Sequence, residues 1–213
     1  MLGMDIDVFL YRLSVAIIPV LFAITVHEVA HGWTARQLGD PTAERAGRLT
    51  LNPIKHIDLV GTVAVPILLL IFSGGSMVFG WAKPVPVMFQ NLRNPRRDMI
   101  TVAAAGPASN LVMAMGWALL AASQEMLFGL EGPAAAWLSG VCVMGILINS
   151  VLAVFNMLPV PPLDGGRVLA GLLPPQQAHL LHRIEPFGFM IVVLLMVSGV
   201  LWTLLEPFLF FFI

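Results

Sequence analysis

Residues 25–32 read Thr-Val-His-Glu-Val-Ala-His-Gly and bring two imidazoles and a carboxylate into one short stretch. His27 and His31 are four residues apart, and residues at this spacing lie on the same face of a helix. Both rings can therefore bind one metal ion. Glu28 follows the first histidine and can reach a water molecule that such an ion holds. The pattern H-E-x-x-H is typical of zinc-dependent hydrolases.

The sequence around this motif is that of a membrane helix. Residues 13–30 are almost wholly apolar until the motif begins. A five-residue match can arise by chance, and a single histidine on an apolar face is usually a core residue bonded to a carbonyl. In hydrocarbon, however, two imidazoles and a carboxylate without a metal would lack partners. Ionisable residues at such depth mark functional sites by default, so the context favours a metal site.

A third protein ligand is expected, because catalytic zinc has three protein ligands and leaves one position to water. Charged residues are scarce in this chain, and Asp164 is the best candidate. It directly follows a proline-rich break at residues 159–162 and lies at a depth similar to that of His27. The alternative role for Asp164 is to cap a short helix over residues 165–173, and one carboxylate can serve both roles.

The composition is that of an integral membrane protein. The 213 residues are 58% hydrophobic and 11% charged, whereas soluble domains contain about 25% charged residues. We expect an all-α polytopic protein with five to six transmembrane or re-entrant helices, forming a single membrane-embedded domain over residues 1–213. The net charge of −1 comes without a basic block, which argues against nucleic acid as a partner. The sequence indicates no particular oligomeric state.

The hydrophobic pattern predicts long helices at residues 8–38, 98–123, 136–158 and 187–205, with a polar loop over residues 174–185. Residues 60–73 are apolar but short and are interrupted by Pro66, so they either span the membrane or re-enter it. Acidic residues precede the first helix and basic residues follow it. The positive-inside rule then places the N-terminus outside the cell membrane and the metal site towards the cytoplasmic side.

Residues 79–89 have prolines at alternating positions, Pro84 and Pro86, which forbid a helix and remove donors from one edge only. This pattern predicts a small membrane-associated β element beside the metal site, and the plainer alternative is a rigid loop. Asn110, within the predicted helix 98–123, is expected to hydrogen-bond to another helix.

Three motifs together give the chain a family resemblance: residues 27–31, residues 105–110 (Ala-Gly-Pro-Ala-Ser-Asn) and residues 156–166 (Asn-Met-Leu-Pro through Leu-Asp-Gly-Gly). In order and spacing they resemble the catalytic core of the site-2 proteases, which are intramembrane zinc metalloproteases, over nearly the whole chain. The resemblance implies that His27, His31 and Asp164 bind one Zn²⁺ per chain. It also implies that Glu28 is the catalytic acid and base that activates the zinc-bound water.

The same resemblance implies candidate substrate-binding residues. Asn156 is similar to the family residue that hydrogen-bonds substrate near the cleavage point, and residues 83–87 resemble the family's membrane-associated β element. With Asn110 added, the candidates are Asn156, Asn110, Lys83, Pro84, Val85, Pro86 and Val87. Two departures stand out. No segment resembles the soluble peptide-binding or nucleotide-sensing domains of many members, and residues 60–72 lie outside the minimal core.

The expected function is hydrolysis of peptide bonds within or near the transmembrane segments of membrane-protein substrates in the lipid bilayer. One alternative is a transporter or metal permease, which would also explain broken helices and polar residues near mid-membrane; the lack of internal repeats argues against it. The other is an inactive relative that binds membrane partners, and the intact set of His27, Glu28, His31 and Asp164 argues against that.

Overall fold

The computed structural model describes residues 6–72, 80–129 and 131–209, and this part of the chain is helical without any strand. The elements are α1 (Ile6–Gln37), α2 (Thr42–Arg45), η1 (Pro53–His56), η2 (Leu59–Ala64), α3 (Val65–Phe72), η3 (Phe89–Asn91), α4 (Pro95–Phe128), α5 (Gly132–Asn156), α6 (Asp164–Leu172), α7 (Pro175–Ile184), η4 (Glu185–Phe187), α8 (Gly188–Val197) and α9 (Val200–Leu209).

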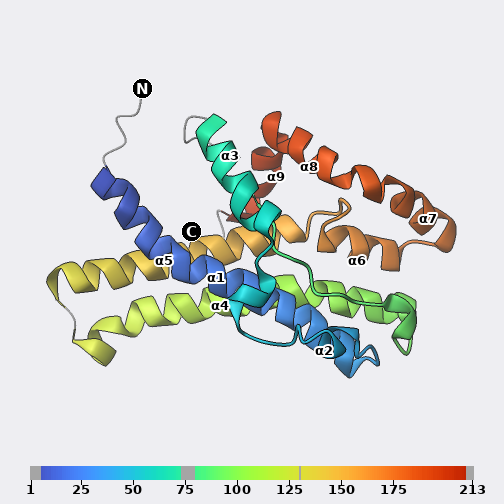
Figure 1. Cartoon of the computed structure of the whole chain (residues 1–213), viewed down its shortest axis with the longest axis horizontal. Helices are drawn as coiled ribbons and strands as arrows, with labels where there is room; N and C mark the ends of the chain where they lie inside the picture. Colours follow the sequence, from blue (N-terminus) through green and yellow to red (C-terminus); the bar gives the residue numbers. More distant parts are fainter. Residues whose placement is uncertain (1–5, 73–79, 130, 210–213) are drawn as a thin grey trace.

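The long helices α1, α4 and α5 pack against one another, and α6 packs against α4 (Figure 1). Small residues allow helices to approach closely in a membrane, where apolar side chains gain little from leaving lipid. Gly145 in α5 is one such position, because a Cβ there would overlap the ring of Trp117 in α4. The three-helix layer therefore forms the rigid frame on which the site is built.

Within the described residues, four helical stretches are long and apolar enough to cross a membrane: Ile6–Gln37, Pro95–Phe128, Gly132–Asn156 and Pro175–Val197. The chain is thus an integral membrane protein. With 32 residues, α1 is about 48 Å long and exceeds a hydrocarbon core of about 30 Å. The helix must therefore tilt, or one of its ends must project from the hydrocarbon core. The motif at residues 27–31 lies in the C-terminal third of α1.

The apolar segment after the first loop forms η2 and α3 in continuous succession. Asp58 caps this helix by accepting hydrogen bonds from the N–H groups of Val60 and Gly61. The helix ends its described part at Phe72 and is shorter than the four candidate spans. Residue 73, the last of the segment predicted to span or re-enter, lies outside the described residues.

Two predicted boundaries are wrong. Most of residues 174–185, predicted as a polar loop, form the helix α7 (Pro175–Ile184), because Gln, Ala, Leu and Arg are good helix formers and a proline is tolerated at the first helical position. The last predicted helix is two helices, α8 and α9, separated by Ser198 and Gly199. Gly199 has φ +77°, a left-handed conformation that ends a helix and that glycine adopts without strain.

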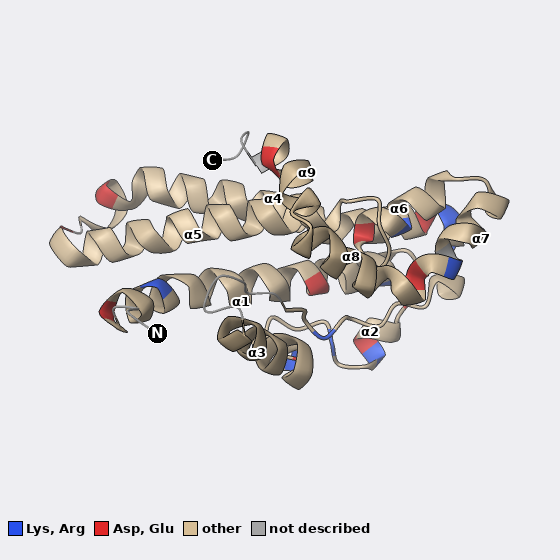
Figure 2. Cartoon of the chain, turned by 90° about the horizontal axis from the view of Figure 1, so that it is seen from above, with Lys and Arg blue, Asp and Glu red and all other residues tan. Residues whose placement is uncertain are grey.

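The predicted β element is not confirmed. Residues 80–88 lie outside any helix or strand and run as an extended stretch of chain (Figure 1), and no strand pairs with them among the described residues; residue 79 lies outside these. Lysines and arginines gather mainly at the end of the molecule that holds α2, α6 and α7, as Figure 2 shows.

Candidate metal centre

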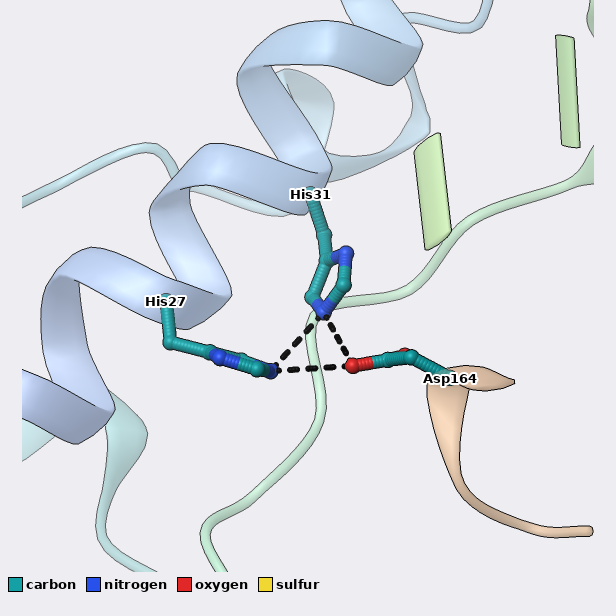
Figure 3. Close-up of side chains that lie close together, drawn as sticks. All are labelled: His27, His31 and Asp164. Atoms are coloured by element: carbon teal, nitrogen blue, oxygen red, sulfur yellow. Dashed lines mark hydrogen bonds and ion pairs between the residues drawn. The ribbon is translucent and has the colours of Figure 1, made fainter. Parts of the chain in front are cut away.

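Three side chains meet where α1 faces the start of α6 (Figure 3). The Nε2 atoms of His27 and His31 lie 3.0 Å apart, and Asp164 Oδ2 lies 3.2 Å from the first and 3.3 Å from the second. All three residues are buried. Two ligands at the usual zinc distances and a tetrahedral angle lie roughly 3.3 Å apart, so the triangle of ligand atoms fits a zinc ion.

The outer nitrogens of both rings are already engaged. His31 Nδ1 lies 2.7 Å from the backbone carbonyl of Val102, and a carbonyl only accepts, so this nitrogen carries hydrogen. His27 Nδ1 lies 2.5 Å from Asn110 Oδ1. In neutral rings with these tautomers, both Nε2 lone pairs point at each other and at Asp164 Oδ2, which has no hydrogen-bond partner. Three converging acceptors with no proton between them are stable only around a cation.

Glycines bring Asp164 to the histidines. A Cβ at Gly165 would overlap the carbonyl oxygens of Met157 and Leu158, and one at Gly166 would lie 2.6 Å from Pro161 N. Without side chains at these two positions, the first turn of α6 sits directly on the turn that follows α5. This contact places the Asp164 carboxylate against both imidazoles, and a carboxylate binds metal in its ionised form.

Gly106 of α4 forms the wall behind the two rings. A Cβ at this position would overlap His31 Nε2 and lie 2.6 Å from His27 Nε2. Any larger residue would thus occupy the space into which the ligand nitrogens project. The Ala-Gly-Pro motif singled out in the sequence places this glycine where it leaves room for the metal site.

Glu28 lies one residue beyond His27 and is half-buried. Its Oε2 accepts a 2.7 Å hydrogen bond from the backbone N–H of Val85. The extended segment at residues 80–88 therefore holds the carboxylate that the motif supplies. The sequence does not predict this contact, because every residue type except proline carries a backbone N–H.

A cavity of about 430 Å³ opens onto this cluster. It is lined by the three candidate ligands and Glu28, by the extended segment, and by parts of α5, α6 and α8. Most of its other lining side chains are apolar, with Asn156 and Arg167 as polar exceptions. Arg167 also lies over the ring of Phe89, 5.7 Å from its centroid. The cavity is thus mostly apolar, and its lining includes the candidate ligands and Glu28.

One edge of the extended segment is bound to the protein. Trp81 N–H donates to Gly61 O at 3.0 Å, and Lys83 N–H donates to His56 O at 2.9 Å. Successive residues in an extended chain direct their backbone groups to opposite sides. The carbonyls of the intervening residues therefore face the other way, on an edge where Pro84 and Pro86 offer no N–H.

The predicted substrate-binding residues divide into two groups. Asn156, Pro84, Val85 and Val87 line the cavity, whereas Lys83, Pro86 and Asn110 do not. Asn156 Nδ2 donates to Leu152 O of its own helix at 2.9 Å.

Asn110 is fully buried and bonds to α1 and α5, so the predicted hydrogen bond to another helix is confirmed. Its partner Asn149 was missed in the sequence. A polar side chain inside the apolar run of residues 141–155 was the signal that could have found it.

Known proteins similar to this chain are metalloproteases by name. Residues 119–199 match the profile of the family described as Peptidase family M50. The chain is 40% identical to the "Putative zinc metalloprotease YwhC" of Bacillus subtilis, over 89% of this chain and 85% of that protein. It is 33% identical to the "Putative zinc metalloprotease Rip2" of Mycolicibacterium smegmatis, over 85% of this chain and 66% of that protein. No solved structure matches.

Proposed function

We propose, on the premise that this chain belongs to peptidase family M50, the site-2 proteases, that it is an endopeptidase for membrane-protein substrates. A zinc metalloprotease in the membrane follows from the family and from the four apolar helices. The finer proposal is that it hydrolyses peptide bonds within or near transmembrane segments. The observation that carries it is the meeting of the three ligand atoms, together with Glu28, in the lining of a mostly apolar cavity.

His27, His31 and Asp164 would hold one zinc ion per chain through Nε2, Nε2 and Oδ2. The triangle of distances and the outward hydrogen bonds of both rings support this assignment. When bound, zinc acts as a Lewis acid that acidifies water and polarises a carbonyl.

Glu28 is the proposed general base and acid. Its half-buried carboxylate lies beside His27 and faces the cavity, so it can take the proton of the attacking water. It can then deliver that proton to the leaving amine, as a positioned carboxylate does in general acid–base catalysis. Val85 N–H holds one carboxylate oxygen and leaves the other for this exchange.

The extended segment is the proposed docking edge for substrate. A transmembrane helix keeps its carbonyls in internal hydrogen bonds, so it must unwind before cleavage. Residues 82, 84 and 86 offer backbone carbonyls along the edge that faces away from Gly61 and His56. An unwound substrate can donate its N–H groups to them in strand addition, and Asn156, which lines the same cavity, can contact it as well. The predicted small β element would then form when substrate pairs with this segment.

The proposed orientation has the N-terminus outside the cell membrane and the site towards the cytoplasm. The gathering of Lys and Arg at the end with α2, α6 and α7 supports it (Figure 2). We further propose that residues 1–213 act as a single membrane-embedded protease domain.

The test is a cleavage assay in proteoliposomes with a model transmembrane peptide, paired with metal analysis of the same samples. We expect wild type to bind zinc and cleave the peptide, and Glu28→Gln to bind zinc without cleaving. Equal cleavage by both proteins would remove Glu28 from its role. Metal-dependent flux without proteolysis would instead indicate a transporter or permease, which the family relationship does not favour.

A further inference from the structure

We propose that Asn110 and Asn149 are positioning residues that fix the ring of His27 for metal binding. This inference rests on the ligand assignment proposed above. Both asparagines are fully buried, with 0% of each exposed, and neither lines the cavity. Their amides therefore act on the site only through His27.

A directed chain of hydrogen bonds links three helices to this ring. Asn149 Nδ2 in α5 donates to Gly145 O at 2.8 Å. Asn110 Nδ2 in α4 donates to Asn149 Oδ1 at 2.9 Å and to Ala23 O of α1 at 3.3 Å. Asn110 Oδ1 then lies 2.5 Å from His27 Nδ1.

The chain has only one satisfactory direction. If the Asn110 amide were flipped, its oxygen would face two other acceptors, Ala23 O and Asn149 Oδ1. The Asn149 amide is held in the same sense by Gly145 O, which can only accept. Asn110 Oδ1 must therefore accept a hydrogen bond from His27 Nδ1–H. In the neutral ring this leaves the Nε2 lone pair free and aimed at Asp164.

The two histidines differ in how they are held. His31 Nδ1 bonds to the backbone carbonyl of Val102, which no substitution removes. His27 depends on a side-chain amide, which depends in turn on a second amide from another helix. Buried amides are costly unless fully bonded, and groups that orient metal ligands typically contribute 10–100-fold to metal affinity. We infer that Asn110 and Asn149 contribute to metal affinity in this way.

The experiment measures zinc affinity by chelator competition on the full chain in nanodiscs. Asn110→Ala should weaken zinc binding about 10–100-fold. Asn149→Ala should weaken it less but in the same direction, because Asn110 keeps its bond to Ala23 O. Cobalt loaded into the same variants should give altered visible absorption bands, since a freely rotating His27 ring changes the ligand geometry.

Ser150→Ala is the matched control. Ser150 neighbours Asn149 in α5 and is equally buried, and its Oγ has no hydrogen-bond partner. This variant should bind zinc with wild-type affinity. Wild-type affinity in both asparagine variants would overturn the proposal, as would an equal loss in Ser150→Ala. If Asn110→Ala does not fold, Asn149→Ala decides alone. Because the readout is zinc affinity, an absence of proteolysis in wild type would overturn the proposed function and leave this inference standing.

Discussion

Val85 donates its backbone N–H to Glu28 Oε2 at 2.7 Å. This bond joins the proposed catalytic carboxylate to the segment proposed to bind substrate. The Glu28 side chain is thus held from outside its own helix, and its position depends on how residues 80–88 lie. By the same alternation, the Val85 N–H lies on the edge that also carries the N–H groups of Trp81 and Lys83. A substrate that paired with the opposite edge would therefore lie across the width of this segment from Glu28.

Shortening the Glu28 side chain should test whether catalysis needs the position of the carboxylate as well as its charge. Glu28→Asp keeps a carboxylate but removes one methylene, so it no longer reaches both Val85 N–H and the cavity. We expect zinc content to stay at the wild-type level and kcat to fall about 100-fold, the typical effect of a misplacement of about 1 Å. Single-turnover cleavage of a transmembrane peptide measures this, and a wild-type kcat would show that the contact is not needed.

Removing the late carboxylate should release the metal. Asp164→Ala eliminates one of three proposed ligands and leaves two imidazoles facing a void. We expect zinc affinity to fall at least about 100-fold, more than changes in residues behind a ligand usually cause. Metal analysis after dialysis against a weak chelator is the measurement. Full zinc occupancy in this variant would exclude Asp164 as a ligand.

Adding one methyl group at Gly106 should disrupt the site without removing a ligand. The Cβ of Gly106→Ala would overlap His31 Nε2 and lie 2.6 Å from His27 Nε2. We expect zinc affinity to fall by about 10–100-fold or more, because both rings must move. Gly116→Ala in the same helix is the control, since a Cβ there meets nothing within 4 Å. Equal zinc binding by the two variants would contradict the proposed wall.

The prolines of the extended segment should matter for substrate and not for metal. Replacing Pro84 and Pro86 with alanine adds two N–H groups to the open edge and loosens the backbone. We expect unchanged zinc content and a raised KM for a transmembrane peptide. Pro175→Ala, at the start of α7 and outside the cavity lining, serves as the control. Wild-type KM for every peptide tried would remove the edge from substrate binding.

Asp40 should make the free energy of unfolding depend on pH in the acidic range. It is fully buried and accepts hydrogen bonds from Met88 N–H at 2.7 Å, Asn91 Nδ2 at 3.0 Å, and the N–H and hydroxyl of Thr42. Burial raises the pKa of Asp40, but these bonds lower it more, and the net pKa lies below the usual value.

Since the unfolded pKa is about 4, the stabilisation by Asp40 is complete above about pH 4 and is lost as pH falls through the lower folded pKa. We expect Asp40→Asn to unfold at a lower temperature than wild type at pH 7, because an amide cannot accept all these bonds. The difference between the two proteins should shrink below about pH 4. Thermal unfolding in detergent across this range measures it, and a constant difference would assign the effect to something other than ionisation.

Sequence reasoning reached the proposed ligands because metal chemistry limits residue types strictly. His27, Glu28 and His31 share a helix. Asp164 is one of few charged residues in the chain, and it follows the proline-rich break at residues 159–162. The helices α1, α4 and α5 were predicted to within a few residues at most ends, since long apolar runs dominate the pattern.

The features that the sequence did not predict have several physical causes. The polar residues of α7 indicate a loop although their helix propensity is high, and a uniformly apolar run gives no sign of the break at Gly199. The bond from Val85 to Glu28 involves a backbone group, and the role of Gly106 depends on the distance between two helices. Residue types alone carry neither kind of information.

The proposed ligands lie far apart in the order of synthesis. His27 and His31 enter the membrane with the first helix, but Asp164 follows only after α4 and α5 have been made and inserted. A nascent chain that ends before the start of α6 would expose two imidazoles with no carboxylate to complete the set. Zinc loading would then be a late step in biogenesis, and proteolytic competence would arise only after the three-helix frame has assembled.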